Sequence, residues 1–233
     1  MLIINFTGHS GFTVESENNF LIFDYYTGSL PEIPEGKKIT VFVSHSHYDH
    51  FNCDIFKLRD LYPEVRYVLS YDIPGSVLES FGVKDAVTAY PDKPCSLDTR
   101  LKFRTLPSTD AGVAYLVSAD EKNIFHAGDL NLWLWETMNE SEAYSMTAAF
   151  REFTKRLKGF VIHTAFLPLD TRLGTYSWLA FNYYMTNFRI QHAVPMHLFG
   201  PDRIITDFMS DPVSLPYRDR IIPMRPGDTE NIQ

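Results

Sequence analysis

Three histidines and one aspartate fall within six consecutive residues, in the run HSHYDH at residues 45–50. The whole chain has only 8 histidines, so this run is far denser than an even scatter would give. Imidazole and carboxylate groups together suit a borderline divalent cation; zinc is the expected ion, and manganese or iron are alternatives. The run therefore predicts a site for one or two divalent metal ions. A solvated polar turn is the alternative interpretation.

The strand expected at Thr40–Ser44 leads directly into this run. In extended backbone alternate side chains lie on one face, so His45, His47 and Asp49 are expected to converge. His50 then lies at the turn into the next helix. Ligands are commonly presented at such a junction between a buried strand and a loop.

The other elements follow from the periodicity of apolar residues and from turn residues. Strands are expected at Leu2–Phe6, Phe12–Glu15, Phe20–Asp24, Val65–Ser70, Leu101–Leu106, Val113–Ser118, Asn123–His126, Phe160–Phe166, Ile190–Met196 and Ile221–Met224, the last of which closes the sheet. Helices are expected from Asn52 to about Leu61, at Ile73–Phe81, from about Glu142 to Lys158, at Tyr176–Phe188, and from Pro201. This order predicts an α/β protein with two mixed sheets and helices on their outer faces.

Length and composition narrow the class of protein. A chain of 233 residues is expected to form a single domain, residues 1–233. The formal net charge of -8 argues against nucleic-acid and anionic-membrane partners and favours a small-molecule substrate; a homo-oligomer is compatible with it. Cys53 and Cys95 are isolated, which fits a reducing compartment. Since we find neither a signal peptide nor a run of about 20 apolar residues, a cytoplasmic protein is expected.

The run HSHYDH resembles the H-x-H-x-D-H signature of the metallo-β-lactamase superfamily, and further motifs follow in the family's order over most of the chain. The resemblance implies a four-layer αββα sandwich with a dinuclear metal site between its sheets. The segments Gly8-His9-Ser10 and Pro226–Asp228 are further similar to the L-ascorbate-6-phosphate lactonase-like branch.

Three more residues match family positions. Asp129, in the motif HAGD, matches the carboxylate that bridges two metal ions, and His197 matches the last histidine ligand. Asp24 matches the aspartate of the first motif, and we expect it to orient a ligand histidine through a hydrogen bond. The metal ligands that the resemblance implies are His45, His47, Asp49, His50, Asp129 and His197.

The sequence departs from the family pattern at one ligand. The family supplies a histidine between H-x-H-x-D-H and the bridging aspartate, but the matching segment, residues 107–112, contains none. Asp110 is the best substitute, because a carboxylate can replace an imidazole as a ligand; the harder site would favour manganese or iron over zinc. Alternatively Asp110 is only a turn residue before Gly112. A mononuclear site would then remain, with the ligands Asp49, His50, Asp129 and His197.

Four residues are candidates for substrate binding. His9 lies in a loop where the lactonase-like branch places a residue near the mouth of the site. Asn131 and Trp133 follow the bridging aspartate and suit a mainly apolar pocket. Arg172 can bind an anionic group or pair with Asp170. Structural roles are the alternative for all four.

These features predict a hydrolase that acts on an ester, lactone or phosphoester in a small metabolite. The metal would lower the pKa of water and polarise the scissile bond. Asp49 or Asp129 would accept or deliver the proton. The rival interpretation is a metal-binding member of the fold that has lost catalysis and acts as a sensor or scaffold. The missing histidine supports this rival, and the retained ligands oppose it.

Overall fold

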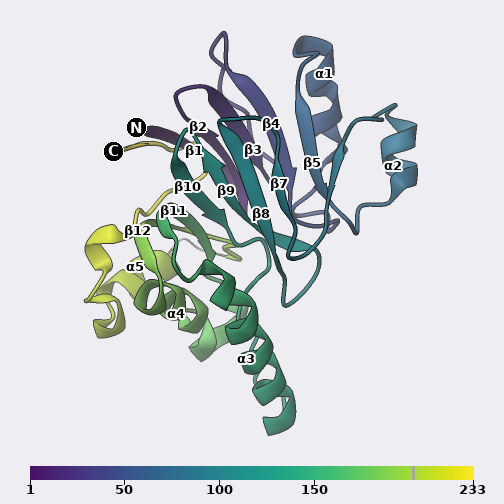
Figure 1. The fold of residues 1–233 in the computed structure, drawn as a ribbon. Coiled ribbons are helices and arrows are strands. Elements are labelled where there is room, and N and C mark those ends of the chain that lie inside the picture. Colours follow the sequence, from purple (N-terminus) through teal and green to yellow (C-terminus); the bar gives the residue numbers. More distant parts are fainter. Residues whose placement is uncertain (201–202) are drawn as a thin grey trace.

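Two β-sheets lie face to face, and helices cover the outer face of each sheet (Figure 1). The computed structural model describes residues 1–200 and 203–233. The four layers confirm the expected αββα sandwich.

The first sheet has seven strands in the order β13-β1-β2-β3-β4-β5-β6. The strands are β1 (Leu2–Gly8), β2 (Gly11–Glu15), β3 (Asn19–Phe23), β4 (Lys38–Val43), β5 (Arg66–Ser70), β6 (Val87–Ala89) and β13 (Thr229–Ile232). β1, β2 and β3 are antiparallel neighbours, whereas β3 to β6 run parallel. The parallel half therefore brings several carboxyl ends to one edge of the sheet.

The second sheet has six strands in the order β12-β11-β10-β9-β8-β7. They are β7 (Pro94–Ser96), β8 (Leu101–Pro107), β9 (Val113–Ala119), β10 (Lys122–His126), β11 (Val161–Pro168) and β12 (Arg189–Met196). β10, β11 and β12 are parallel. Their carboxyl ends also share one edge.

The helices differ from the predicted ones mainly at their ends. The α-helices are α1 (Leu58–Leu61), α2 (Gly75–Ser80), α3 (Glu140–Thr154), α4 (Leu179–Asn187) and α5 (Arg203–Ser210). Helix α3 begins two residues earlier than expected, because Asn139 and Glu142 form a reciprocal capping box. A 3-10 turn around Gly174 delays the start of α4, and another, Cys53–Lys57, precedes α1.

Both faces of the central strands are buried, which explains their nearly continuous apolar sequences. In β4, Phe42 packs into the core between the sheets, while Val41 and Val43 pack into the core under α1 and α2. In β5, Val68 faces the inner core and Tyr67 faces the outer one, where its hydroxyl donates to the carbonyl of Ile55.

The strand predicted at Ile221–Met224 is wrong. Only Ile221 forms a bridge there, to Ala193. The last strand is instead β13, which pairs with β1 and places the two chain ends side by side (Figure 1). Its sequence is mostly polar because its side chains are largely exposed, so apolar periodicity could not reveal it. The helix expected from Pro201 has its first residue outside the described residues.

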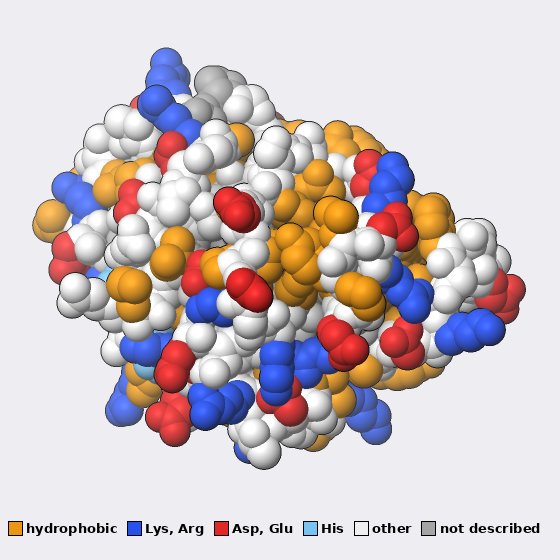
Figure 2. All heavy atoms as spheres, turned by 90° about the horizontal axis from the view of Figure 1, so that it is seen from above, with side chains coloured by type: hydrophobic (Ala, Val, Ile, Leu, Met, Phe, Trp, Pro, Cys, Tyr) orange, Lys and Arg blue, Asp and Glu red, His pale blue; other side chains and the backbone are white. Residues whose placement is uncertain are grey.

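The surface carries both signs of charge. On the face in Figure 2, acidic and basic side chains lie next to one another around a patch of hydrophobic side chains. The described residues of this face thus form no continuous basic surface. In the part of the chain that the structure describes, no helix is both long and apolar enough to cross a bilayer.

Candidate metal centre

Five side chains that carry chemistry lie just beyond the carboxyl ends of parallel strands. Asp24 follows β3, and His45 follows β4. In the second sheet, Asp129 follows β10, Asp170 follows β11 and His197 follows β12. Because the carboxyl ends of parallel strands share an edge, both sheets deliver these groups to one end of the sandwich.

The histidine run itself folds as a turn. Strand β4 ends at Val43, and the backbone N–H groups of His50 and Phe51 both donate to the carbonyl of His47 at 3.0 Å. The extended backbone expected here is therefore wrong. The turn buries His45 and His50 and leaves His47 exposed.

The carboxylate of Asp129 lies at the centre of the cluster and is only 3% exposed. Its Oδ1 is 3.2 Å from Nε2 of His50 and 3.2 Å from Nε2 of His197. Its Oδ2 is 3.5 Å from Nε2 of His45. Burial raises the pKa of Asp129, but the neighbouring histidines outweigh burial and hold the pKa well below its ordinary value. Asp129 is therefore ionised and faces both sides of the centre.

Asp24 orients His50 directly, and His45 through Ser44, by hydrogen bonds on the Nδ1 side of each ring. Nδ1 of His50 donates to Oδ2 of Asp24 at 2.8 Å. The Ser44 hydroxyl also donates to this oxygen, at 2.6 Å, and lies 2.9 Å from Nδ1 of His45, whose N–H it can accept. Both Nδ1 atoms then carry hydrogen, which leaves the Nε2 lone pairs free to bind a cation.

The pKa values of His45 and His50 are shifted in opposite directions. Burial, with the nearby His50, lowers the pKa of His45 to about 4, so His45 is neutral and can act as a ligand. Burial also lowers the pKa of His50, but Asp129 and Asp24 outweigh it and raise the pKa to about 10. Without a metal, His50 is thus protonated between the two carboxylates, and a cation bound at its Nε2 would replace that proton.

Asp170 plays the corresponding part on the second sheet, and the sequence analysis missed this role. Its buried Oδ2 accepts from Nδ1 of His197 at 3.1 Å. Its carboxylate also accepts from Nε and Nη2 of Arg172. Asp170 lies four residues after the strand predicted at Phe160–Phe166, much as Asp129 lies three residues after the strand predicted at Asn123–His126. That position was the signal that could have identified it.

The donor atoms fit a divalent cation. Among the described residues, Nε2 of His9, His45 and His50 and Oδ1 of Asp129 are buried without a hydrogen-bond partner. Buried polar atoms without partners are costly, and several of them facing one another are more so. A divalent cation would offset this cost by accepting their lone pairs.

The possible ligand atoms form three overlapping groups, each with all atoms within 4.8 Å of one another. The groups are His45, His50 and Asp129; His47, Asp110 and Asp129; and His9, Asp49, His50 and His197. Together they contain all seven ligands expected from the sequence, and they add His9.

Asp110 lies beside the exposed ligand of the run. Its Oδ2 is 4.0 Å from Nδ1 of His47, and both side chains are half exposed, at 49% and 50%. Burial, followed by the charge of Asp129, raises the pKa of Asp110. Asp110 thus lies where a carboxylate could replace the missing histidine.

Two glycines allow the second sheet to approach Ser44. Gly112 and Gly128 both have positive φ angles, of 64° and 50°. A Cβ atom on Gly112 would lie 2.0 Å from the carbonyl oxygen of Ser44, and one on Gly128 would lie 2.7 Å from Cβ of Ser44. Neither position can accept a side chain without moving the backbone that carries His45.

A cavity of about 750 Å³ opens over the centre. His47, Asp49, Asp110 and Asp129 line its polar side. Its apolar lining consists of Trp133, Trp135, Met138, Met146 and Phe199. The volume is typical of small-molecule sites, which are mostly apolar with a few polar groups.

The four substrate candidates take different places. Trp133 lines the cavity, and its indole N–H donates to the carbonyl of Asp129. Arg172 also lines it, but its guanidinium is paired with Asp170 and stacks 3.6 Å from the ring centre of Phe199. Asn131 is fully buried, and the described lining of the cavity contains neither Asn131 nor His9. The structure therefore does not support substrate contacts for these last two.

The fold is similar to several solved structures. Igni18, a metallo hydrolase from Ignicoccus hospitalis, has a TM-score of 0.68 at 16% identity over 100% of this chain and 99% of its own. The isothiocyanate hydrolase from Delia radicum gut bacteria has a TM-score of 0.62 at 12% identity over 100% and 99%. CmlA, a diiron β-hydroxylase from Streptomyces venezuelae, has a TM-score of 0.65 at 13% identity over 99% of this chain and 54% of its own.

A comparison with curated proteins found no match. The family model described as "Beta-lactamase superfamily domain" matches residues 3–141, which is more than half of the chain. This segment contains the histidine run, Asp110 and Asp129. The chain therefore belongs to the beta-lactamase superfamily, with the metallo-β-lactamase fold.

Proposed function

We propose that this chain is a metal-dependent hydrolase that cleaves an ester, lactone or phosphoester in a small molecule. The observation that carries the proposal is the group of buried, unpartnered donor atoms beneath an open cavity. A purely structural cluster would need neither the free lone pairs nor the access.

The ligands divide into two positions. His45, His47, Asp110 and Asp129 would hold the first ion, and Asp49, His50, Asp129 and His197 the second. We propose zinc as the default ion. The carboxylate of Asp110 makes the first position harder, which favours manganese or iron there.

The chain's own residues supply binding, orientation and proton transfer. A bound divalent ion would act as a Lewis acid, lowering the pKa of water and polarising the scissile bond. Asp49 lines the cavity, and the nearby imidazole of His9, whose Nε2 lies 3.3 Å from Oδ2 of Asp49, holds the pKa of Asp49 well below its ordinary value. Asp49 is therefore ionised at neutral pH and can accept a proton from the attacking water or return it to the leaving group. Asp129 fixes His50 and His197 around the same space.

The cavity favours a substrate with an apolar part. Trp133 and Trp135 stack with ring centres 6.3 Å apart, and Met138 and Met146 complete this wall. Flexible methionines adapt to irregular apolar groups. Within the family, Gly8–Ser10 and Pro226–Asp228 support a place near the lactonase-like branch. The second segment pairs with β1 two residues before the first, since the N–H of Gly227 donates to the carbonyl of Phe6.

Hydrolysis assays with defined metal content test the proposal. The protein would be stripped with chelator, reloaded with zinc, manganese or iron, and assayed on p-nitrophenyl acetate, a γ-lactone and bis-p-nitrophenyl phosphate. Reloaded protein should hydrolyse at least one of these classes, and His50→Ala should reduce the rate at least about 100-fold. His192→Ala, which removes a histidine outside the cluster, should not. Equal rates in stripped and reloaded protein would sink the proposal.

A further inference from the structure

We infer that His9 is a metal ligand that fills the second position, leaving the first position as the one with an open place for the substrate. The inference rests on the proposed metal centre. It assigns His9 a role different from the substrate contact expected from the sequence.

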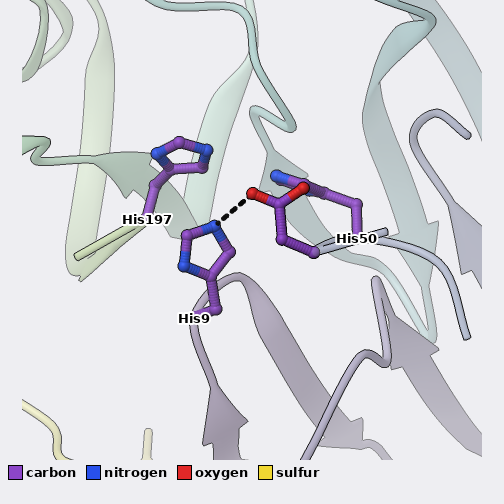
Figure 3. Close-up of side chains that lie close together, drawn as sticks. His9, His50 and His197 are labelled. Carbon is purple, nitrogen blue, oxygen red and sulfur yellow. Dashed lines mark ion pairs between the residues drawn. The ribbon is translucent and has the colours of Figure 1, made fainter. Parts of the chain in front are cut away.

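His9 lies in the turn between β1 and β2, far in sequence from the histidine run. Its Nε2 is 3.3 Å from Oδ2 of Asp49. Its ring centre is 4.4 Å from that of His197 and 5.4 Å from that of His50. Figure 3 shows the three imidazoles around one shared space, with the ion pair of His9 drawn as a dashed line. His9 therefore faces the second position from the side opposite the histidine run.

The ring nitrogen Nε2 of His9 faces this space. Nε2 is buried and, among the described residues, has no hydrogen-bond partner of good geometry. The side chain is only 10% exposed, and the described lining of the cavity does not include it. A substrate-binding residue would need access from the cavity. An unpartnered imidazole behind the ligands suits a cation better.

The backbone holds His9 in a conformation that needs support. His9 and His197 both have positive φ angles, of 55° and 60°, and the N–H of His197 donates to the carbonyl of His9 at 2.9 Å. A register shift between Phe6 and Gly8 turns the end of β1. Left-handed non-glycine residues and bulges are frequent where a fold re-aims functional side chains. This backbone hydrogen bond directs the imidazoles of His9 and His197 into the same space.

With His9 included, the two positions become unequal. Three imidazoles and two carboxylates surround the second position, from His9, Asp49, His50, Asp129 and His197. Metal sites that protein ligands fill are closed, whereas catalytic sites keep an open place. At the first position, His47 and Asp110 remain half exposed. The second ion should therefore be retained, and the first should exchange and meet the substrate.

Two variants at residue 9 test the ligand role. His9→Gly and His9→Asn both tolerate the left-handed backbone and remove the imidazole. Each should weaken binding of the more tightly held equivalent about 10–100-fold, measured by competition with a chromophoric chelator. Bound cobalt(II) should show a changed d–d spectrum in both variants. His192→Asn, on β12 but outside the cluster, is the matched control and should leave affinity and spectrum unchanged.

Two further measurements separate a ligand role of His9 from a structural one. Added imidazole should restore affinity and spectrum to His9→Gly, because it can fill the space of the lost ring; a merely structural role would not respond. In a crystal of the wild-type protein loaded with zinc, anomalous scattering should place an ion about 2.0–2.1 Å from Nε2 of His9.

The outcomes separate this inference from the proposed function. If the wild-type protein binds no metal, the proposed centre fails. If it binds metal but both variants keep the wild-type affinity and cobalt spectrum, only the role of His9 is overturned. An ion in the crystal beyond bonding distance of Nε2 overturns it as well. The expected losses with imidazole rescue support it.

Discussion

Asp24 and Asp170 orient two histidines of the candidate metal centre from opposite sheets. Asp24 accepts from Nδ1 of His50, and Asp170 accepts from Nδ1 of His197. Both carboxylates are buried and point their partners' Nε2 atoms at Asp129. Such outer contacts fix the tautomer and the direction of a ligand and commonly change metal affinity by about 10–100-fold.

Asp170→Asn is expected to weaken metal binding at the second position by about 10–100-fold. An amide cannot attract the Nδ1–H of His197 as strongly as a carboxylate does, so His197 is held less firmly. A chelator titration of the purified variant measures the change. Asp54→Asn, which alters an exposed aspartate paired with Lys57, should retain the wild-type affinity. An unchanged affinity in Asp170→Asn would show that Arg172 or packing alone positions His197.

Asp110→Ala is expected to lose the equivalent at the first position while the second stays filled. Its carboxylate lies 4.0 Å from His47 and is the group available to replace the missing histidine. Asp110→His should raise the affinity for zinc relative to manganese, because nitrogen ligands suit zinc better than oxygen ligands do. Elemental analysis after dialysis distinguishes the variants. A full metal complement in Asp110→Ala would identify Asp110 as a turn residue.

The candidate ligands of the run could be proposed from the sequence because they are close together in it, and the spacing of His45 and His50 alone drew attention to them. Asp170, His9 and Ser44 were harder, since their roles depend on which strands become neighbours. Asn131 follows Asp129 closely in the sequence, but its side chain is fully buried.

The turn between β9 and β10 ties the second sheet to the hairpin of the first. The carboxylate of Asp120 accepts from the Ser16 hydroxyl, from the backbone and side-chain N–H groups of Asn18, and from the side chain of Asn19, at 2.6–3.0 Å. Burial raises the pKa of Asp120, but these hydrogen bonds outweigh burial and lower the pKa below its ordinary value of 3.8. The anionic form therefore stabilises the contact between the sheets.

Asp120→Asn is expected to destabilise the protein by about 1–2 kcal/mol at pH 7, because it removes charge-assisted hydrogen bonds at a partly exposed site. Asn tolerates the left-handed backbone at this position, where φ is 46°. Urea unfolding measures the difference. Since the folded-state pKa is lowered, the difference should be constant above pH 5 and shrink as the pH falls below 3.8. Glu121→Gln, in the same turn, controls for the loss of charge.

The central strands were predictable because burial on both faces leaves apolar runs, as in β4 and β5. Local hydrogen bonds set the limits of that approach. The backbone was expected to stay extended after β4, but hydrogen bonds to the carbonyl of His47 form a turn there. Polar β13 is a strand only because β1 offers it an edge.

Both sheets contribute candidate ligands, so a bound ion would link the sheets. His45 and His50 come from the first sheet, and Asp129 and His197 come from the second. The ligand atoms are assembled only in the folded chain, and binding therefore favours the native state.

Chelator is expected to lower the melting temperature of the metal-loaded protein by about 5–10 °C. Free metal at about 100 times its Kd contributes about 2.7 kcal/mol, and each kcal/mol shifts the melting temperature of a chain this long by about 2–4 °C. Differential scanning calorimetry with and without chelator measures this shift. His50→Ala, which removes a ligand of the second position, should show a smaller shift between the two conditions. A wild-type protein insensitive to chelator would count against a cation that links the sheets.

Substitution of Gly112 or Gly128 in a related chain should affect its metal centre. Each lies where even a methyl group would displace Ser44. A descendant with alanine at either place would keep every histidine and aspartate and still misplace His45, so its metal centre should be lost. A survey that compares only ligands would count such a chain as intact. Related chains that lost metal binding are therefore to be sought by the residues at these two glycine positions.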